Sequence, residues 1–515
     1  MNTPDRSVLA RLAEHAARTP DRPCLIHGRR LVSYGEFRDA SLRVARALVE
    51  EGIEPGARVA LILENSPDFA LAYQGTLSAG AVAVPLNPNG PPAAIESVFR
   101  DCRPRAAFVG AAIAPAVLAI ASRLPGFKCF HMAAASAPAE GMVNVEGLTE
   151  GPARTPSPDR DIGPAPDPDA LALIVYTSGT TGTPKGVRLS HANLREIAMA
   201  GQQLFDVGPA DRLGAVVPLF HLYGLREIDL TLWAGAALVI PRDTHFLAAV
   251  LNQLHDARVT GLASVPSALT LLVDRYHAEL RVCGEHLRYL AIGTAPAPAR
   301  LRAALRDLLP TTRLVVTYGL TEASRVCWAD ISDPGSPSDA RNVGRPYSGV
   351  TLRLVDESGG VGRVALHSGM VMAGYWNQPE ATRRVVTNDA YLLTPDCGRF
   401  EPDGTLHLLG RIDDVINCGG QKVSPDEVEE VLADYPGVAA VTVLGAADPA
   451  GVLGQVVHAM VIAESGTVLD ASALRAHAAS RLAPYKVPAR IEFVDAIPKS
   501  LLGKPQRARL REVPT

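Results

Sequence analysis

The segment YTSGTTGTPKG at residues 176–186 combines three glycines, four threonines, one serine and one lysine. Glycines leave backbone amides accessible, and hydroxyl and ammonium groups donate hydrogen bonds, so this composition indicates phosphate binding. The segment is not a P-loop, because that motif requires Gly-Lys and then Ser or Thr after a first glycine and four further residues. Counted from Gly179, the corresponding position is Pro184, and Lys185 is followed by another glycine. The sequence therefore predicts a phosphate-binding loop of a different kind.

Six further segments place polar and charged residues in short runs of the kind that form active sites. They are PLFHLYG (218–224), VVTYGLTEA (315–323), GYWNQPEAT (374–382), TPDCGRF (394–400), GRIDDVINCGGQKVSPDEVE (410–429) and PKSLLGKPQR (498–507). A single short motif has a high false-positive risk, whereas seven in a fixed order are specific. The segments are therefore interpreted together.

Two strands are expected to hold the phosphate-binding loop. The runs LALIVY at 171–176 and GVRLS at 186–190 have the length and composition of short buried strands. Ser190 or Asn193 is expected to cap a helix over residues 192–205. A loop between two strands differs from a P-loop, which opens directly into a helix.

The N-terminal part of the chain alternates helical and strand patterns. A helical pattern over residues 37–52 is followed by apolar runs at 58–63 and 81–87, which predicts an α/β fold with buried strands. Residues 151–170 hold six prolines and are predicted to be a connector.

The C-terminal part begins with a clear helix start. Ser424 is expected to be the N-cap, Pro425 the first helical residue, and Glu427 the residue that completes a capping box. Two β-rich runs, a helix and another strand follow, which predicts a small α+β domain of about a hundred residues.

The predicted boundary between the two parts lies in GRIDDVIN, at residues 410–417, where adjacent aspartates interrupt apolar sequence. The predicted domains are therefore residues 1–411, a large α/β domain of several subdomains, and residues 412–515, a small α+β domain.

Length and composition limit the classes of protein that the chain can belong to. A chain of 515 residues calls for at least two domains. A net charge of −4, with 47% hydrophobic and 20% charged residues, is typical of a soluble globular protein and gives no basic field for nucleic acid.

The seven cysteines are scattered and form no C-x-x-C pair, which disfavours a disulfide framework or structural metal site and makes the reducing cytoplasm the expected location. No stretch has the pattern of a signal peptide or the ~18 apolar residues of a membrane span.

The seven segments together resemble the class I adenylate-forming superfamily, which includes acyl- and aryl-CoA synthetases, adenylation domains of nonribosomal peptide synthetases, and beetle luciferases. They occur in the family's order across nearly the whole chain. The resemblance implies a large N-terminal domain and a small, mobile C-terminal domain. It also implies that a carboxylate attacks the α-phosphate of ATP to give an acyl-adenylate and pyrophosphate, and that a thiol then expels AMP.

The resemblance gives the phosphate-binding loop the task of following the β- and γ-phosphates as pyrophosphate leaves. The residues that it implies for this task are Thr177, Ser178, Gly179, Thr180, Thr181, Gly182 and Lys185.

A second group of implied roles lies in TYGLTEA. By resemblance, Tyr318 stacks on adenine, Thr321 contacts the α-phosphate, and Glu322 is a ligand of Mg²⁺. One carboxylate is a reasonable protein contribution, because Mg²⁺ takes few protein oxygens and leaves its other positions to phosphate and water.

The nucleoside is expected to contact two further residues. By resemblance, Asp396 accepts hydrogen bonds from both ribose hydroxyls, and Arg411 lies near the ribose and phosphate as a permanent cation. The family usually has Thr-Gly-Asp here, whereas this chain has Pro395 before the aspartate. Proline fixes φ and removes an amide donor, so the ribose contact is where this chain departs from the family pattern.

The C-terminal part carries the implied catalytic lysine and hinge. Lys504 matches the lysine that bridges the substrate carboxylate and the α-phosphate, where charge builds in the transition state. Because Lys504 and the thiol must reach the same centre in turn, the resemblance implies that the small domain rotates between the two steps. Asp413 matches the hinge position.

The acid is expected to bind in a pocket of the N-terminal domain. The implied residues are Tyr223, Gly224, Arg226, Glu227, Gly293, Thr294, Gly319 and Arg325. His221 occupies a position typical of acyl- and aryl-CoA synthetases, where domains that activate α-amino acids usually carry an aspartate. This histidine argues against an ordinary α-amino acid as the substrate.

The adjacent charged residues Arg226 and Glu227 do not decide which acid is bound. Neighbouring helical residues point about 100° apart, so at most one is expected to face the pocket. An inward Glu227 favours an ammonium or hydroxyl on the acid, and an inward Arg226 favours a second acidic group, with Arg325 as a helper. Both side chains could instead be solvated or paired with other protein groups. A small or medium polar acid is expected in preference to a long saturated fatty acid.

The thiol acceptor also has two candidates. Coenzyme A is favoured by the resemblance, and the alternative is the phosphopantetheine arm of a separate carrier protein, since the chain has no carrier signature of its own. A different class of function is a catalytically inactive nucleotide-binding regulator. The presence of Lys504, Glu322 and the phosphate-binding loop argues against that class, and nothing in the sequence selects luciferase-like oxidation.

Overall fold

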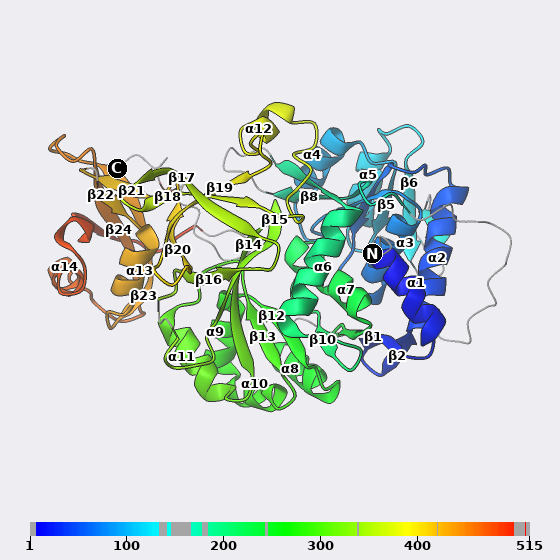
Figure 1. The fold of residues 1–515 in the computed structure, drawn as a ribbon, viewed down its shortest axis with the longest axis horizontal. Coiled ribbons are helices and arrows are strands. Elements are labelled where there is room, and N and C mark those ends of the chain that lie inside the picture. Colours follow the sequence, from blue (N-terminus) through cyan, green and yellow to red (C-terminus); the bar gives the residue numbers. More distant parts are fainter. Residues whose placement is uncertain are drawn as a thin grey trace.

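The computed structural model describes residues 7–132, 142–145, 166–177, 184–242, 246–336, 339–419, 421–498 and 510 of the 515-residue chain. Within these residues, the larger part of the molecule has two β-sheets with helices between them and on both outer faces (Figure 1). A smaller unit with its own core lies at one end. Most of the predicted connector, residues 151–165, lies outside the described residues.

The first sheet has seven strands and includes the predicted strands of the N-terminal part. In sheet order they are β7 (Met142–Val145), β6 (Lys128–Met132), β5 (Ala106–Val109), β3 (Arg58–Ile62), β4 (Val82–Pro85), β8 (Leu171–Thr177) and β9 (Lys185–Ser190). All neighbours are parallel except β8 and β9, which form an antiparallel pair. Helices α4 (Pro92–Cys102) and α5 (Ala114–Ala121) cover its outer face.

The second sheet has 13 strands. In sheet order they are β17 (Thr351–Ser358), β18 (Val361–His367), β19 (Leu392–Phe400), β20 (Leu406–Arg411), β16 (Asn342–Pro346), β15 (Ala323–Asp330), β14 (Arg313–Leu320), β13 (Tyr289–Ile292), β12 (Gly261–Ser264), β10 (Arg212–Gly214), β11 (Ala237–Val239), β1 (Pro23–His27) and β2 (Arg30–Ser33). The stretch from β14 to β1 is parallel. Helices α8 (Leu247–Asp256), α9 (Pro266–Arg275), α10 (His277–Gly284) and α11 (Ala299–Leu308) cover its outer face.

The layer between the sheets contains the helices whose buried residues belong to the largest core cluster of the described residues. They are α1 (Val8–Arg18), α2 (Tyr34–Glu50), α3 (Pro67–Ser78), α6 (His191–Phe205) and α7 (Leu222–Ala234). A short helix, α12 (Pro379–Arg383), lies outside this layer.

Helix α2 shows why the predicted pattern folds this way. Ser33 and Glu36 form a capping box at its start. Phe37, Val44 and Leu48 are spaced so that they lie on one face, and all three are buried. Apolar burial of this kind stabilises the fold by roughly 1.5–3 kcal/mol for each large side chain.

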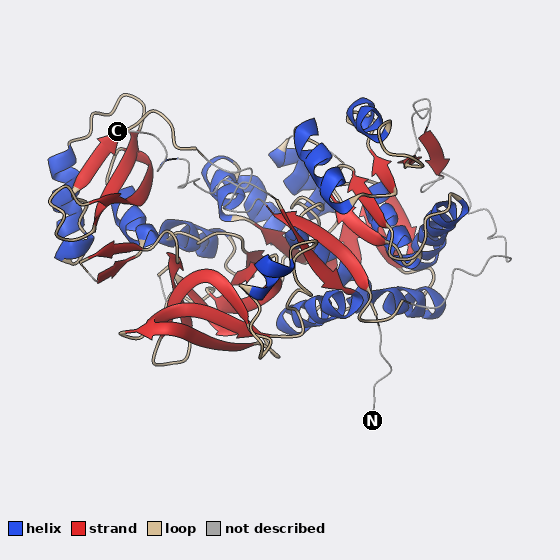
Figure 2. Ribbon diagram, turned by 90° about the horizontal axis from the view of Figure 1, so that it is seen from above, coloured by secondary structure: helices blue, strands red, loops and turns tan. Residues whose placement is uncertain are grey.

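The smaller unit has a separate hydrophobic core. Its elements are β21 (Ile416–Cys418), β22 (Gln421–Val423), α13 (Pro425–Ala433), β23 (Val438–Ala447), β24 (Gln455–Ala463), α14 (Ala471–Ala479), a 3-10 helix (Pro484–Lys486) and β25 (Arg490–Phe493). Val428, Val443 and Leu474 are fully buried among them. Viewed from above, this unit stands beside the larger part of the molecule (Figure 2).

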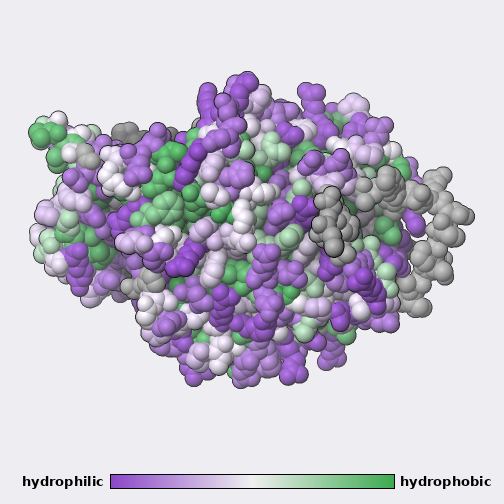
Figure 3. Space-filling view, viewed as in Figure 1, coloured by the Kyte–Doolittle hydropathy of each residue, from purple (hydrophilic) through white to green (hydrophobic). Residues whose placement is uncertain are grey.

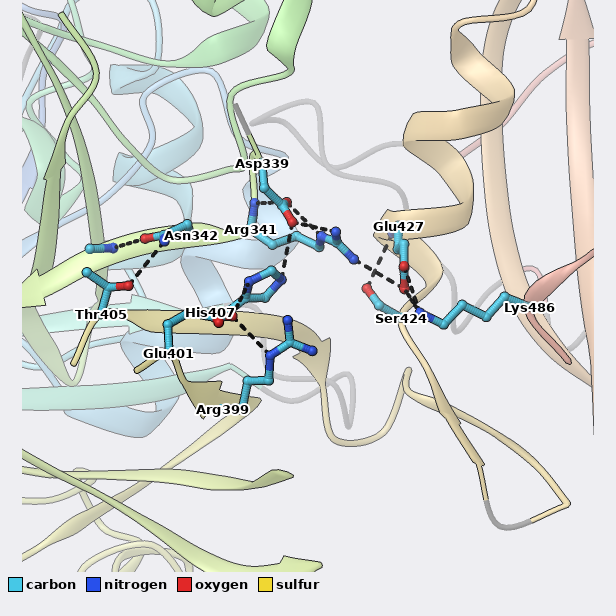
Figure 4. A network of polar contacts seen from close by, with 11 residues as sticks. Asp339, Arg341, Asn342, Arg399, Glu401, Thr405, His407, Ser424, Glu427 and Lys486 are labelled. Carbon is cyan, nitrogen blue, oxygen red and sulfur yellow. Dashed lines mark hydrogen bonds and ion pairs between the residues drawn. The ribbon is translucent and has the colours of Figure 1, made fainter. Parts of the chain in front are cut away.

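The start of α13 follows the predicted cap with one correction. Ser424 is the N-cap and its hydroxyl accepts a hydrogen bond from the Glu427 amide at 3.3 Å, but the Glu427 carboxylate does not complete a capping box. The carboxylate instead accepts from Lys486 Nζ at 2.7 and 2.8 Å and pairs with Arg341 Nη1 at 3.2 Å (Figure 4). Two cations outcompete one backbone amide, because charge-assisted bonds are the stronger ones.

The face of the molecule that Figure 3 shows is mostly hydrophilic, with hydrophobic side chains scattered over it in patches. Among the described residues, none of the helices has the length and apolar character needed to cross a membrane.

Candidate active site

The predicted phosphate-binding loop connects β8 and β9, as expected, and its base is well defined. Thr177 and Lys185 face each other across the antiparallel pair, with the threonine hydroxyl 3.5 Å from the Lys185 carbonyl oxygen. The loop residues Ser178, Gly179, Thr180, Thr181 and Gly182 lie outside the described residues. Ser190 caps α6, with Asn193 completing the capping box.

The ammonium group of Lys185 and the carboxylate of Glu322 lie next to the same tyrosine. Lys185 Nζ is 5.2 Å from the ring centroid of Tyr375, a distance typical of a cation–π contact. The Tyr375 hydroxyl donates a hydrogen bond of 2.8 Å to Glu322 Oε1. Burial, followed by the nearby Glu322 carboxylate, raises the pKa of Tyr375, so the phenol remains a donor at neutral pH. The predicted phosphate and metal contacts are thus brought together.

Sequence reasoning gave Tyr375 no role, although it lies in the recognised segment GYWNQPEAT. The segment returns to the β8–β9 hairpin, where the Trp376 amide donates to the Gly186 carbonyl at 2.7 Å and the Arg188 amide donates to the Gly374 carbonyl at 3.0 Å. The only sign of this role in the sequence was that the tyrosine lies inside the recognised segment, directly after Gly374. Its hydroxyl orients Glu322, and its ring faces Lys185.

Thr321 and Glu322 form the tip of a tight hairpin. Leu320 pairs with Ala323 across β14 and β15, which leaves only these two residues in the turn. Gly319 precedes the turn, and a Cβ atom there would lie 2.0 Å from the Ser324 carbonyl oxygen, so only glycine fits. The strand geometry therefore presents Thr321 and Glu322 together at one edge of the sheet.

Tyr318, Asp396 and Arg411 form the neighbouring part of the site. The Tyr318 hydroxyl donates to Asp396 Oδ2 at 2.5 Å, and Asp396 pairs with Arg411 across β19 and β20. Burial and the adjacent carboxylate raise the pKa of Tyr318 well above its usual value. The charge of Arg411 also acts on the pKa of Tyr375, which it lowers. Arg411 is therefore near the tyrosine that contacts Lys185 and Glu322.

Pro395 is accommodated without moving Asp396 away from the site. The pairing of β18 with β19 is irregular between Arg363 and Ala365, opposite this proline, and such irregularities are where a strand tolerates a residue without an amide donor. The Asp396 amide donates to the Thr394 hydroxyl at 3.1 Å, and the Pro395 carbonyl accepts from Ile412 at 2.7 Å. The departure from the family pattern therefore leaves the carboxylate in place.

Several residues that are predicted to line the acid pocket meet at the carboxyl ends of β12 and β13. The Tyr223 hydroxyl donates to the carbonyl oxygens of Ser264 and Ala291, both at 3.2 Å. A Cβ atom on Gly293 would lie 2.8 Å from the Tyr223 ring, so this glycine permits a close approach of the ring to the strand. Thr294 has φ of 74°, an unfavourable conformation for a β-branched residue of the kind that concentrates at functional sites.

His221 is the N-cap residue of α7, and Gly224 lies in the first turn of the same helix. A Cβ atom on Gly224 would lie 2.2 Å from the Pro218 carbonyl oxygen. Burial lowers the pKa of His221, so the imidazole is neutral at neutral pH. Phe220 packs beside it, with the two ring centroids 4.5 Å apart.

Arg226 and Glu227 are both buried and pair with one another. Because α7 begins at Leu222, these residues lie in its second turn rather than its first, as the sequence had suggested. Arg226 Nε is 3.4 Å from Glu227 Oε1, and Arg325 Nη2 is 3.7 Å from the same oxygen. Both side chains are therefore buried and paired with other protein groups, which was the alternative left open by the sequence, and which of them faces the acid stays a prediction.

The remaining predicted residues are Asp413 and Lys504. Asp413 is exposed in a turn between β20 and β21, where the amides of Asp414 and Val415 both donate to the Arg411 carbonyl at 2.8 Å. Lys504 lies outside the described residues.

The residues present suit one Mg²⁺ ion held mainly by a nucleotide. Within the described part of the chain, no group of three His, Cys, Asp or Glu side chains could hold a metal by itself. Glu322 offers one carboxylate beside the cationic Lys185. This donor set matches the preference of Mg²⁺ for one or two carboxylates, with phosphate and water as its other ligands.

Two sheets with a small separate unit, and Lys185 and Glu322 next to the same tyrosine, are the features of the class of adenylate-forming enzymes. The chain belongs to the AMP-binding enzyme family, whose main domain matches residues 12–376 and whose C-terminal domain matches residues 427–504.

Three known proteins illustrate the similarity. The sulfoacetate–CoA ligase of Cupriavidus necator is 31% identical over 98% of this chain and 97% of its own. The fatty acid–[acyl-carrier-protein] ligase ScoC of Streptomyces coeruleorubidus is 31% identical over 97% of this chain and 94% of its own. The crystal structure of ATP-bound MatB from Rhodopseudomonas palustris matches with a TM-score of 0.83 at 27% identity, and 98% of each chain is covered.

These similarities confirm the predicted family, the fold class and an enzyme that ligates acids to thiols. The roles of individual residues and the domain limits 1–411 and 412–515 stay predictions.

Proposed function

We propose that this enzyme uses Mg²⁺ and ATP to convert a carboxylic acid to an acyl-adenylate, releasing pyrophosphate, and then transfers the acyl group to coenzyme A. The observation that carries the proposal is that Lys185 and Glu322 both contact Tyr375, while Asp396 and Arg411 lie opposite each other across the neighbouring strands β19 and β20. These positions support a cation for phosphate from the seven-stranded sheet, and a carboxylate for metal and a carboxylate for ribose from the 13-stranded sheet.

The proposed nucleotide contacts follow from these positions. Lys185 and the β8–β9 loop bind the β- and γ-phosphates, Glu322 holds Mg²⁺, and Thr321 contacts the α-phosphate. Mg²⁺ neutralises charge on the phosphates when it is bound. Asp396 accepts from the ribose, after exchanging its present donor, the Tyr318 hydroxyl, for the ribose hydroxyls. Tyr318 then offers its ring face to adenine.

The acid lies between His221 and the residues at the end of β13. A neutral imidazole at position 221, in place of a carboxylate, supports an acid without an α-ammonium group. The relatives do not decide the acid, since the names of two that match equally well specify sulfoacetate and fatty acids. The acid must be inferred from this chain's own pocket.

Coenzyme A is proposed as the acceptor because the sulfoacetate relative is named as a CoA ligase. Loading of a separate carrier protein is the second candidate, supported by the acyl-carrier-protein ligase at the same identity. Thioester formation with coenzyme A, compared with a panel of phosphopantetheinylated carrier proteins, distinguishes the two acceptors.

The small unit is proposed to move between the two half-reactions. The support is its separate hydrophobic core and its connection to the larger part through the exposed turn at Asp413. Lys504 is proposed to bridge the acid and the α-phosphate during adenylation only. The proposed limits of the two domains are residues 1–411 and 412–515.

The test is pyrophosphate release from ATP with a panel of carboxylic acids. The proposal predicts release that requires both an acid and Mg²⁺, with AMP as the other product after thiol is added. Binding of ATP without turnover of any acid would instead identify an inactive nucleotide-binding protein.

A further inference from the structure

A cluster of buried charge lies under the acid pocket and has more positive than negative groups. It consists of Arg226, Glu227 and Arg325, which are 2%, 5% and 1% exposed. Two guanidinium groups and one carboxylate carry a net charge of +1. Arginine remains protonated even when buried, although burial and the neighbouring Arg325 lower the pKa of Arg226.

The nearby phenols do not supply the missing negative charge. Burial raises the pKa of Tyr223 to about 12 and that of Tyr289 well above its usual value. Both hydroxyls are therefore neutral at neutral pH. An uncompensated buried cation is costly for the folded protein, so a cluster of this kind favours a bound anion.

Several hydrogen-bond donors of the cluster have no partner within the described residues. Arg226 Nη2 has none, and neither do the Nε, Nη1 and Nη2 atoms of Arg325. Among the residues that the structure describes, the carboxylate paired with Arg325 is that of Glu227, at the long distance of 3.7 Å. Tyr347 lies against Arg325, but its hydroxyl does not reach hydrogen-bond geometry. Buried donors are nearly always satisfied in native proteins, which points to a missing acceptor.

The cluster lies next to residues that are predicted to line the acid pocket and to contact the nucleotide. The Arg226 guanidinium carbon lies over the ring of Tyr223, 4.0 Å from its centroid, and the hydroxyl end of that ring lies close to Gly293. Arg226 Nη1 also lies 3.5 Å from the Ser324 carbonyl oxygen, next to the turn that carries Thr321 and Glu322. An acid whose first carboxylate reaches that turn would therefore have its far end near Arg226.

We propose that Arg226 and Arg325 bind a second anionic group, a carboxylate or a sulfonate, at the far end of a short acid. This inference rests on the proposed activation of carboxylic acids and specifies which acids are activated. The planar guanidinium groups suit a carboxylate or sulfonate because both anions accept paired hydrogen bonds. The acid is short because Arg226 lies against the Ser324 carbonyl, close to the turn that carries Thr321 and Glu322, where the first carboxylate is proposed to react.

Matched pairs of acids test the inference. Each pair has the same chain length and differs in the far end: malonate with propionate, succinate with butyrate, and sulfoacetate with propionate. The measurement is kcat/KM for pyrophosphate release from ATP. For at least one pair, the diacid is expected to exceed its monoacid partner by about 30-fold or more, since an unfilled polar site rejects the analogue that lacks the group.

Variants then assign the preference to the arginines. Arg226→Gln and Arg325→Gln should each lower kcat/KM for the preferred diacid by about 30-fold and change that for its monoacid partner by less than about threefold. Arg226→Lys keeps the charge without the planar fork and should give an intermediate loss. Arg302→Gln removes another fully buried arginine, far along the chain on α11, and should leave the ratio unchanged.

A second readout is independent of turnover. The preferred diacid, added with a non-hydrolysable ATP analogue, should raise the melting temperature of the wild-type protein but not that of Arg226→Gln. This comparison also holds if Arg226→Gln is less stable, because each protein is compared with itself.

The outcomes separate this inference from the proposed function. Activation of monoacids at rates equal to or above those of every diacid overturns the inference and leaves acid activation standing. An unchanged diacid-to-monoacid ratio in Arg226→Gln and Arg325→Gln also overturns it. Failure of every acid to release pyrophosphate overturns both.

Discussion

At the scale of single residues, Tyr375 connects two groups that sequence reasoning treated separately. Its hydroxyl donates to Glu322 and its ring faces Lys185. It is therefore a positioning residue, because it fixes the direction of the carboxylate that is proposed to hold Mg²⁺. A metal ligand that accepts a hydrogen bond from a neighbouring side chain is held in one orientation and binds the metal more tightly.

Removal of the Tyr375 hydroxyl tests this role. Tyr375→Phe retains the ring but not the donor, so Glu322 is no longer oriented. We expect the Mg²⁺ concentration for half-maximal pyrophosphate release to rise about tenfold, because removal of a group that hydrogen-bonds to a metal ligand typically weakens metal binding by this factor or more. Tyr485→Phe, at a tyrosine that is 40% exposed in the smaller unit, is the control. An unchanged Mg²⁺ dependence with a lowered melting temperature would mean that the hydroxyl is only structural.

At the scale of elements, helices α3 and α7 meet through a buried polar contact. The Tyr73 hydroxyl on α3 donates to Asp229 Oδ2 on α7 at 3.1 Å, and Asp229 is 1% exposed. Burial raises the pKa of Asp229 to about 7. The helix that carries His221 and Arg226 is thus held in place by a carboxyl group that is easily protonated.

The pH dependence of stability follows from this raised pKa. The unfolded value is about 4, so between about pH 4 and pH 7 the folded protein retains a proton that the unfolded chain has lost. The free energy of unfolding therefore falls as the pH rises through that window. Asp229→Asn still accepts from Tyr73 and removes the titration. We expect the variant to exceed the wild type by on the order of 2 kcal/mol at pH 8, with little difference at pH 4.

Denaturant unfolding at both pH values measures the Asp229 effect. Asp274→Asn, at an exposed aspartate on α9, should leave the pH dependence as in the wild type. A variant at position 229 that is less stable than the wild type at pH 8 would show that the charged carboxylate is the stabilising form.

At the scale of the whole molecule, one polar network connects the larger part to the smaller unit (Figure 4). Arg341 bonds to Asp339 in the larger part and pairs with Glu427 of α13 at 3.2 Å. Glu427 in turn accepts from Lys486. Because Arg341 and Glu427 are only partly exposed, at 16% and 17%, the pair is less screened than an ordinary surface pair.

Loss of this ion pair should loosen the smaller unit. Arg341→Gln removes the charge that reaches Glu427, and we expect faster amide hydrogen exchange and faster proteolysis in residues 412–415, with a stability loss of about 1 kcal/mol. Arg353→Gln breaks a pair with Asp389 inside the larger part and is the control. Equal exchange in both variants and the wild type would show that the pair does not restrain the smaller unit.

The elements that were predictable have local causes. The β8–β9 hairpin, α2 and the Ser424 cap follow from short patterns of apolar residues and caps. The second partner of Glu427 and the burial of Arg226 were not predictable, because they depend on residues distant in sequence. The same reason explains why Tyr375 was missed: its partner Glu322 lies on a different hairpin.

Adenylation by Lys504 is the central claim, and the two half-reactions of Lys504→Ala test it most directly. The measurement is acid-dependent pyrophosphate release from ATP, compared with thioester formation from supplied acyl-adenylate. We expect the wild type to release pyrophosphate, the variant to do so about 100-fold more slowly because a cation at the developing charge is lost, and thioester formation to be largely spared. ADP and phosphate as products, or equal loss of both half-reactions, would contradict the account.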